Sequence, residues 1–168
     1  MALTTALLPG LAPEAPGEAA AVDALIERVF GPGRYAKSAE RLREGNRFIP
    51  ELSFVAREQG ALVGAVRMWP VRVGGAPALL LGPIAVDPVA RHRGLGHALT
   101  ERACDAAAKA GHGAVVLVGD ASFFLQAGFE PAPRGRILMP GPADPRRILV
   151  RALKAGALDD LEGVVTLP

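Results

Sequence analysis

Residues 79–99, LLLGPIAVDPVARHRGLGHAL, combine an apolar run with a glycine- and arginine-rich loop and the start of a periodic apolar pattern. Residues 79–86 are apolar apart from Gly82-Pro83, a run too short to cross a membrane and typical of a buried strand. Because proline cannot donate a hydrogen bond to a sheet, Gly82-Pro83 predicts a bulge or the point where strand pairing stops. From Leu95 onward the apolar residues share one helical face, which predicts an amphipathic helix that ends at Gly111.

The loop between this strand and this helix carries two arginines and two glycines. The start of a helix leaves about four backbone N–H groups without an intrahelical acceptor and carries about half a positive charge. Gly94 and Gly96 lack a Cβ, so an anion can approach those N–H groups closely. Arg91 and Arg93 add positive charge at the rim. The loop therefore predicts a cradle for a pyrophosphate.

Three interpretations fit this loop. The first is a glycine-rich helix start with solvated arginines, and the second is a dinucleotide-binding turn, although Leu99 then stands where a third small residue is needed. A P-loop is excluded because no Gly-Lys-Ser/Thr follows. The third is a family resemblance: Arg91-x-x-Gly94-x-Gly96, after a strand ending Ile84-Ala85-Val86 and before an amphipathic helix, resembles the acyl-CoA loop of the GNAT superfamily of N-acyltransferases.

Downstream residues extend the resemblance. Residues 114–118 are apolar and β-branched, which predicts a strand, and a short helix-compatible stretch, residues 121–127, follows Gly119-Asp120. Gly128-Phe129 stands where members of the superfamily open the next strand. Gly119-Asp120 followed by Phe123-Phe124 also resembles the YhbS-like branch, so the match covers roughly residues 79–131.

The resemblance implies an α+β (mixed α/β) fold of the GNAT type. We expect a central mixed, mostly antiparallel sheet of six to seven strands, a parallel splayed central pair and about four helices, in one domain over residues 1–168. The implied activity transfers the acetyl group of acetyl-CoA to a primary amine of a small molecule or peptide, by direct attack in a ternary complex. The transfer needs a neutral amine, support for negative charge on the carbonyl oxygen and a proton for the leaving thiol.

The resemblance also implies where the acyl donor lies. Its pantetheine follows the splayed central strand by main-chain hydrogen bonds, and its diphosphate sits on the N–H groups of the loop. The implied contact residues are Ile84, Ala85, Val86, Arg91, His92, Arg93, Gly94, Leu95, Gly96, His97, Ala98 and Phe124.

Phe124 departs from the pattern, because many members carry at this position a tyrosine that protonates the leaving thiolate. A thiol with a pKa of about 8.5 can leave without a strong acid, and losing a general acid costs about ten-thousand-fold at most. Slow transfer is therefore one expectation, and a non-catalytic acyl-CoA-binding or sensing domain is the alternative. A structural domain that binds no cofactor is the third.

Asp120 is the candidate general base, because it ends a strand at the edge where ligands bind in α/β sheets. Its competing role is the N-cap of the short helix that follows, and a water chain to backbone carbonyls is equally compatible with the sequence.

Composition sets the remaining expectations. A length of 168 residues and a net charge of +2 predict one globular domain and no nucleic-acid partner.

The single cysteine, Cys104, indicates a reducing compartment, and the helical wheel places it opposite the apolar stripe as a small filler residue. His92, His97 and His112 lack a metal-ligand spacing, so no metal is expected. No stretch is long enough to span a membrane, which predicts a cytoplasmic protein, and a homodimer stays possible.

The rest of the chain supplies further elements. We expect a first strand near residues 3–8, helices over 22–30 and 37–44, and an antiparallel meander of strands over 53–57, 61–73 and 79–86. The segments 137–139 and 148–150 predict the last two strands, with an edge piece at 164–165. In the resembled superfamily the two early helices border the acceptor site, which makes Arg34 and Tyr35 candidate substrate contacts.

Overall fold

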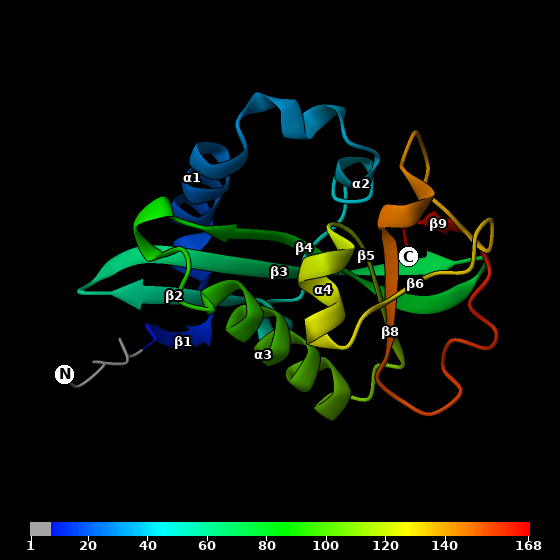
Figure 1. Ribbon diagram of the computed structural model, residues 1–168. Coiled ribbons are helices and arrows are strands. Elements are labelled where there is room, and N and C mark those ends of the chain that lie inside the picture. Colours follow the sequence, from blue (N-terminus) through cyan, green and yellow to red (C-terminus); the bar gives the residue numbers. More distant parts are fainter. Residues whose placement is uncertain (1–7) are drawn as a thin grey trace.

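The computed structural model describes residues 8–168, in which a nine-stranded mixed sheet has the main path β1-β2-β3-β4-β5-β8-β6 (Figure 1). The strands are β1 (Gly10–Pro13), β2 (Phe54–Glu58), β3 (Ala61–Val73), β4 (Ala76–Val86), β5 (Ala114–Val118), β6 (Glu130–Pro131), β7 (Ile137–Leu138), β8 (Ile148–Ala152) and β9 (Gly163–Thr166). The helices are α1 (Ala19–Phe30), α2 (Ser38–Arg41), α3 (Leu95–Lys109) and α4 (Ala121–Phe124). On this path β4 and β5 are parallel and all other neighbours are antiparallel, which confirms the expected fold class.

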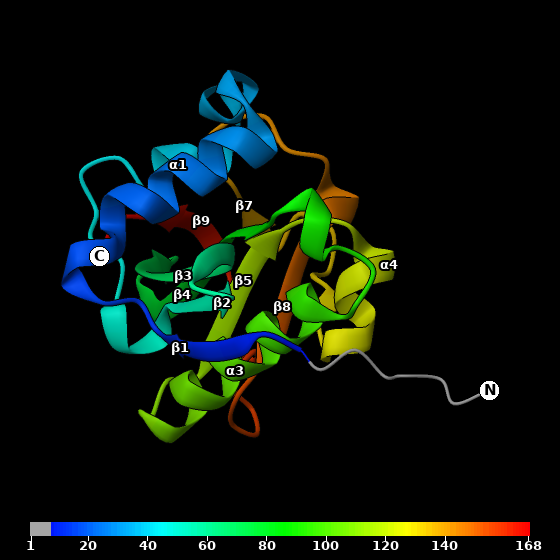
Figure 2. The same ribbon diagram turned by 90° about the vertical axis from the view of Figure 1, so that its left-hand side faces the viewer.

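Helices cover both faces of the sheet. Figure 2 shows α1 on one side and α3 on the other, with the strands between them. The face under α3 holds a core that includes Leu95, Leu99 and Leu79, and the face under α1 buries Val22 and Ile26 against β3 and β4. The apolar spacing of the sequence therefore predicted the inward faces of both long helices.

The central strand is interrupted where the sequence predicted it. Met68 of β3 pairs with Leu81 of β4, and Val66 pairs with Ile84. Gly82 and Pro83 therefore lie where the register between the two strands shifts. On its other edge β4 pairs with β5 only at Leu79 and Leu80. Beyond these two residues β4 and β5 diverge, which leaves an open cleft between them.

Several sequence expectations need correction. The expected strand at residues 3–8 falls, apart from Leu8, outside the described residues, and the first described strand is β1. The second helix is shorter than residues 37–44, because regular α-helix covers only α2. The strands predicted at 137–139 and 148–150 and the edge piece at 164–165 are present as β7, β8 and β9; β7 pairs with β9, and β8 lies between β5 and β6.

Cys104 is also placed differently from the helical-wheel prediction. Its side chain is fully buried in the core under α3, and this burial raises the pKa of its thiol to about 12. The side chain is therefore a small core residue, and a thiol so far from ionisation is a poor nucleophile.

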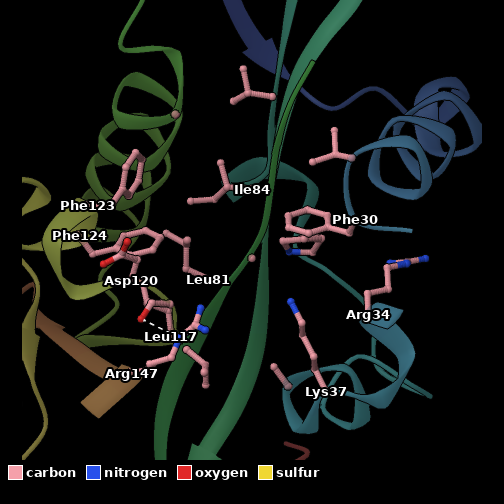
Figure 3. Close-up of a pocket in the computed structure, with 18 of the residues that line it drawn as sticks. Phe30, Arg34, Lys37, Leu81, Ile84, Leu117, Asp120, Phe123, Phe124 and Arg147 are labelled. Atoms are coloured by element: carbon pink, nitrogen blue, oxygen red, sulfur yellow. Dashed lines mark hydrogen bonds between the residues drawn. The ribbon is translucent and has the colours of Figure 1, made fainter. Parts of the chain in front are cut away.

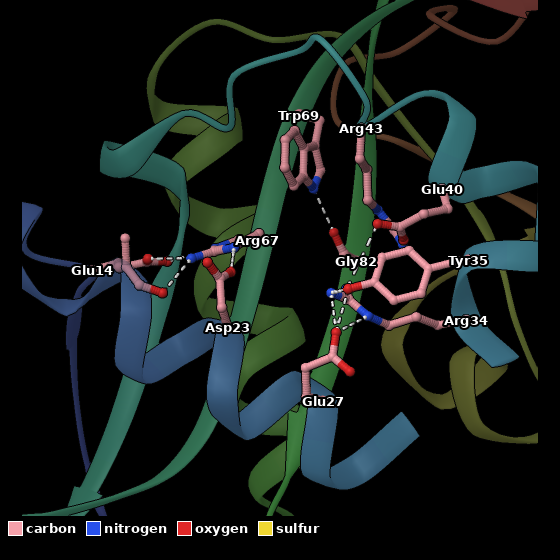
Figure 4. Close-up of polar contacts among 11 residues, drawn as sticks. Glu14, Asp23, Glu27, Arg34, Tyr35, Glu40, Arg43, Arg67, Trp69 and Gly82 are labelled. Carbon is pink, nitrogen blue, oxygen red and sulfur yellow. Dashed lines mark hydrogen bonds and ion pairs between the residues drawn. The ribbon is translucent and has the colours of Figure 1, made fainter. Parts of the chain in front are cut away.

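A buried ion cluster joins the start of the chain to the central sheet (Figure 4). The Arg67 guanidinium, on β3, donates to both carboxylate oxygens of Glu14, at 3.0 and 2.7 Å, and to Asp23 of α1 at 2.7 Å. The guanidinium also lies 4.3 Å from the centre of the Phe48 ring. Because the Glu14 side chain is only 1% exposed, its charge depends on Arg67 for compensation.

Replacing Glu14 by Gln keeps the side-chain size and removes the charge opposite Arg67. We expect the free energy of unfolding to fall by about 2–4 kcal/mol, because a buried guanidinium then lacks one charged partner. Urea denaturation measures the change, with Glu51→Gln as the control, since Glu51 is exposed and has no ion pair within residues 8–168. A loss no larger than that of the control would contradict a structural role for the cluster.

Candidate active site

A cleft of about 860 Å³ opens where β4 and β5 diverge. β4 runs through its middle (Figure 3) and divides it into two parts, which we call the α3 half and the α1 half. The α3 half is lined by residues of β5, by the N-terminus of α3 and by α4, among them Leu117, Gly119, Gly94, Gly96, His97, Phe123 and Phe124. The α1 half is lined by Val29, Phe30, Arg34, Lys37, Ser38 and Arg43.

The loop before α3 presents a row of free backbone amides to the α3 half. Within the described residues the N–H groups from His92 to His97 have no hydrogen-bond acceptor. The predicted range is too wide at both ends: the Arg91 amide donates to Pro88 O and the Ala98 amide to Gly94 O. Gly94 has φ +78°, a conformation that favours glycine, and it caps α3. The free amides and the helix dipole together form an anion cradle.

The predicted contact residues divide between those that line the cleft and those that do not. Ile84, Val86, Arg91, His92, Gly94, Leu95, Gly96, His97 and Phe124 line it. Arg93 is not among the lining residues, because its guanidinium forms two 2.8 Å hydrogen bonds with the Glu58 carboxylate. These bonds hold the pKa of Glu58 below its ordinary value. Ala85 is buried against α1 and Ala98 also lies off the cleft surface.

Aromatic side chains form the wall of the α3 half. The Phe123 ring stacks on the His97 imidazole with centroids 4.1 Å apart, and Phe124 meets Phe123 edge-to-face at 4.8 Å. Glycines make room for both rings: a Cβ on Gly96 would lie 3.0 Å from the Phe123 ring, and one on Gly119 only 2.5 Å from Phe124. The Phe-Phe pair was visible in the sequence, whereas the stacking on His97 depends on tertiary contact.

Asp120 caps α4. Its Oδ1 accepts hydrogen bonds from the Ser122 amide at 2.9 Å and the Ser122 hydroxyl at 2.8 Å. These bonds, from the hydroxyl first and the amide second, hold the pKa of Asp120 below its ordinary value, and the Arg147 charge adds to the effect. A carboxylate with a lowered pKa is a poor proton acceptor, so the geometry favours the capping role over general-base catalysis.

The α1 half is cationic, a property that the sequence did not reveal. The turn after α1 brings Arg34 and Lys37 to its surface, and the turn that follows α2 brings Arg43. Tyr35, the other candidate from this segment, does not line the cleft, and its hydroxyl donates to Glu27. Arg34 was a predicted candidate contact and does line the cleft, whereas Arg43 belongs to a stretch whose charges look solvated in the sequence, and only the fold brings its guanidinium against Gly82 of β4.

Residues 8–168 contain neither a cluster of side chains suited to a metal ion nor a helix that could span a membrane. No group of three or more His, Cys, Asp or Glu side chains is arranged there to hold a metal ion. None of the helices there is long and apolar enough to cross a membrane.

Comparison with known proteins assigns the family. Residues 50–131 match the model of the acetyltransferase (GNAT) domain. The uncharacterized N-acetyltransferase YhbS of Escherichia coli K12 is 31% identical over 154 residues, which cover 90% of this chain and 92% of YhbS. The chain therefore belongs to the GNAT family of acetyltransferases.

Within this family the similarity is to the YhbS branch, as the sequence motifs indicated. The crystal structure of E. coli YhbS in complex with CoA has a TM-score of 0.82 and 30% identity, and the match covers 97% of this chain and 91% of that one. A GNAT acetyltransferase from Brucella melitensis in complex with acetyl-CoA has a TM-score of 0.60 and 27% identity, over 89% of this chain and 97% of that one.

The cradle makes a testable prediction. Replacing Gly96 by Val places a branched side chain between the free amides and the Phe123 ring. We expect coenzyme A to bind at least about tenfold more weakly, because an anion can no longer approach the amides closely. Calorimetric titration with coenzyme A measures the affinity, and thermal unfolding checks that the fold is retained.

The matched control for this variant is Gly10→Val. Gly10 lies in β1, where an added Cβ meets nothing within 4 Å and valine suits the strand. Equal coenzyme A affinities for Gly96→Val and the control would contradict the assignment of the cradle.

Proposed function

We propose that this protein transfers the acetyl group of acetyl-CoA to a primary amine of a small molecule or peptide, by direct attack in a ternary complex. The observation that carries the proposal is the row of free amides from His92 to His97 at the end of a cleft formed by diverging parallel strands. Support comes from the two relatives whose structures contain CoA and acetyl-CoA.

The residues of the α3 half fit such a donor. The cradle and the Arg91 side chain suit a diphosphate, because amides at a helix start and a guanidinium both donate to phosphate oxygens. Ile84 and Val86 lie on the stretch of β4 that no longer pairs with β5, so this edge is open to a pantetheine chain, although the Val86 carbonyl already accepts a hydrogen bond from Arg91 Nε at 3.2 Å. A volume of about 860 Å³ lies within the ordinary range of ligand sites.

When bound, acetyl-CoA supplies an acetyl thioester. The amine lone pair forms the new C–N bond, the C–S bond breaks with its electron pair on sulfur, and the proton lost by the amine balances the charge on the thiolate. The chain's own residues orient the two reactants from opposite sides of β4. Phe123 and Phe124 exclude water on the donor side, which strengthens polar interactions in the cleft.

Phe124 favours a second candidate, a non-catalytic acyl-CoA-binding domain. Its ring carries no proton to give, and Asp120 is engaged as a helix cap. A free thiol with a pKa of about 8.5 is nevertheless a fair leaving group, which supports slow transfer.

The deciding experiment mixes the purified protein with acetyl-CoA and pooled amines and peptides. Mass spectrometry detects acetylated products, and calorimetry measures donor binding. Products with donor binding support the enzyme, and tight binding without products supports the binding domain. No heat and no rise in melting temperature would contradict both.

A Phe124→Tyr variant tests whether a tyrosine hydroxyl at this position assists the departure of the thiolate. We expect about tenfold faster transfer at pH 7 and a smaller gain at pH 9, because a thiolate needs less help from an acid above its pKa of about 8.5. Release of free thiol measures the rate, and the Cys104 side chain is fully buried, so the thiol reagent does not reach it in the folded protein. Phe123→Tyr is the control, since it adds the same hydroxyl to the adjacent ring. An equal gain in both variants would contradict a role specific to position 124.

The cellular compartment and the oligomeric state of the protein are predictions. We place the reaction in the cytoplasm on the ground that Cys104 is the single cysteine. Pairing of two copies through an edge strand is compatible with the sheet, whose main path ends at β1 and β6.

A further inference from the structure

The α1 half of the cleft has an unusual charge for a site that receives an amine. Its charged residues as defined above are Arg34, Lys37 and Arg43. Two acidic residues also line the cleft, and both are engaged: Asp120 caps α4, and Asp144 pairs with Arg146 at 2.9 Å.

Two acids, the buried Glu40 and the partly exposed Glu27, hold two of these cations in place (Figure 4). Glu40, which is 7% exposed, receives Arg43 Nη1 at 2.9 Å and lies 3.6 Å from Arg34 Nη1. Arg34 also donates to Glu27 at 2.8 Å. Neither Glu27 nor Glu40 lines the cleft, so these acids fix the guanidinium groups without presenting negative charge to a ligand.

Arg43 keeps unused donors at the bend of β4. Its Nη2 has no hydrogen-bond acceptor within the described residues, and a Cβ on Gly82 would lie 2.9 Å from it. Glycine at this position therefore lets the guanidinium reach the strand. Trp69 Nε1 donates to Gly82 O at 2.6 Å and secures the bend from the β3 side.

Lys37 adds a cation with no ion-pair partner among residues 8–168. Its ammonium lies 5.7 Å from the centre of the Phe30 ring, and Figure 3 shows its side chain reaching toward β4 across the α1 half. Arg43 and Lys37 are also remote from the cradle, since Gly82 precedes Val86 by four residues, about 13 Å of strand.

From these contacts we infer that the acceptor amine carries an anionic group, a carboxylate or a phosphate, which Arg43 and Lys37 bind in the α1 half. The inference rests on the proposed function and specifies its substrate class. A guanidinium with free donors and a nearby ammonium recognise either anion by charge-assisted hydrogen bonds.

The same charges bear on the choice of acceptor. Arg34 and Arg43 are partly compensated by Glu27 and Glu40, whereas Lys37 is in no ion pair among residues 8–168. The site therefore offers no acid to attract a second ammonium group, and it disfavours polycationic acceptors such as polyamines.

The test compares matched amines at equal acetyl-CoA concentration, with free thiol release as the readout. Leucine is paired with isoamylamine and phosphoethanolamine with ethanolamine, so that the two arms separate carboxylate from phosphate; spermidine represents polycations. We expect kcat/KM for at least one anionic member to exceed that of its partner about tenfold or more, with spermidine poorest.

A Lys37→Met variant supplies the specific readout. We expect KM for the preferred anionic amine to rise about tenfold while KM for its partner without the anionic group is unchanged or lower. Lys109→Met is the control, because Lys109 is exposed in the last turn of α3. Arg43→Lys, which retains the charge next to Glu40, serves as a second variant with the same expected direction.

Failure of the substrate-class inference and failure of the proposed acetyltransferase function give different results. Efficient acetylation of isoamylamine, ethanolamine or spermidine without preference for the anionic amines overturns this inference and leaves the acetyltransferase intact. Equal KM changes for both members of a pair in Lys37→Met also overturn it. No thiol release with any amine overturns the proposed function and this inference together.

Discussion

The structure depends on backbone hydrogen-bonding groups that the sheet and helices leave unpaired. Buried amides and carbonyls must find partners, so a strand that leaves its neighbour opens a place for another chain or a ligand. β4 leaves β5 after Leu80, is shifted in register at Gly82-Pro83 and continues into a loop whose amides point out of the helix. The cleft, the anion cradle and the partition into two halves all follow from this one interruption.

Sequence patterns predicted those parts of the fold that depend only on residues a few positions apart in the chain. The apolar run with Gly82-Pro83 predicted both a central strand and its irregularity, and the glycines before Leu95 predicted the free amides at the start of α3. Asp120 was predicted as a candidate general base with helix capping as its competing role, and the capping role could be anticipated because it depends on residues two or three positions away. These features need no information about distant parts of the chain.

Features that depend on distant contacts were missed or wrong. Cys104 was placed outside the apolar stripe because small helix residues carry little periodic signal, and the sheet in fact buries that side of α3. The pairing of the Arg93 guanidinium with Glu58 was not predicted, although the Arg93 amide belongs to the free row of the cradle. The cationic α1 half depends on Arg43 and Lys37 meeting β4, and no spacing within the sequence reveals a contact between segments so far apart.

The most direct measurement of the central claim is a crystal structure of this protein with coenzyme A. The diphosphate oxygens are expected at about 3 Å from the amides between Gly94 and His97, with the pantetheine chain along Ile84 and Val86 between the diverging strands. A coenzyme bound elsewhere, with those amides bonded only to protein or water, would contradict the account.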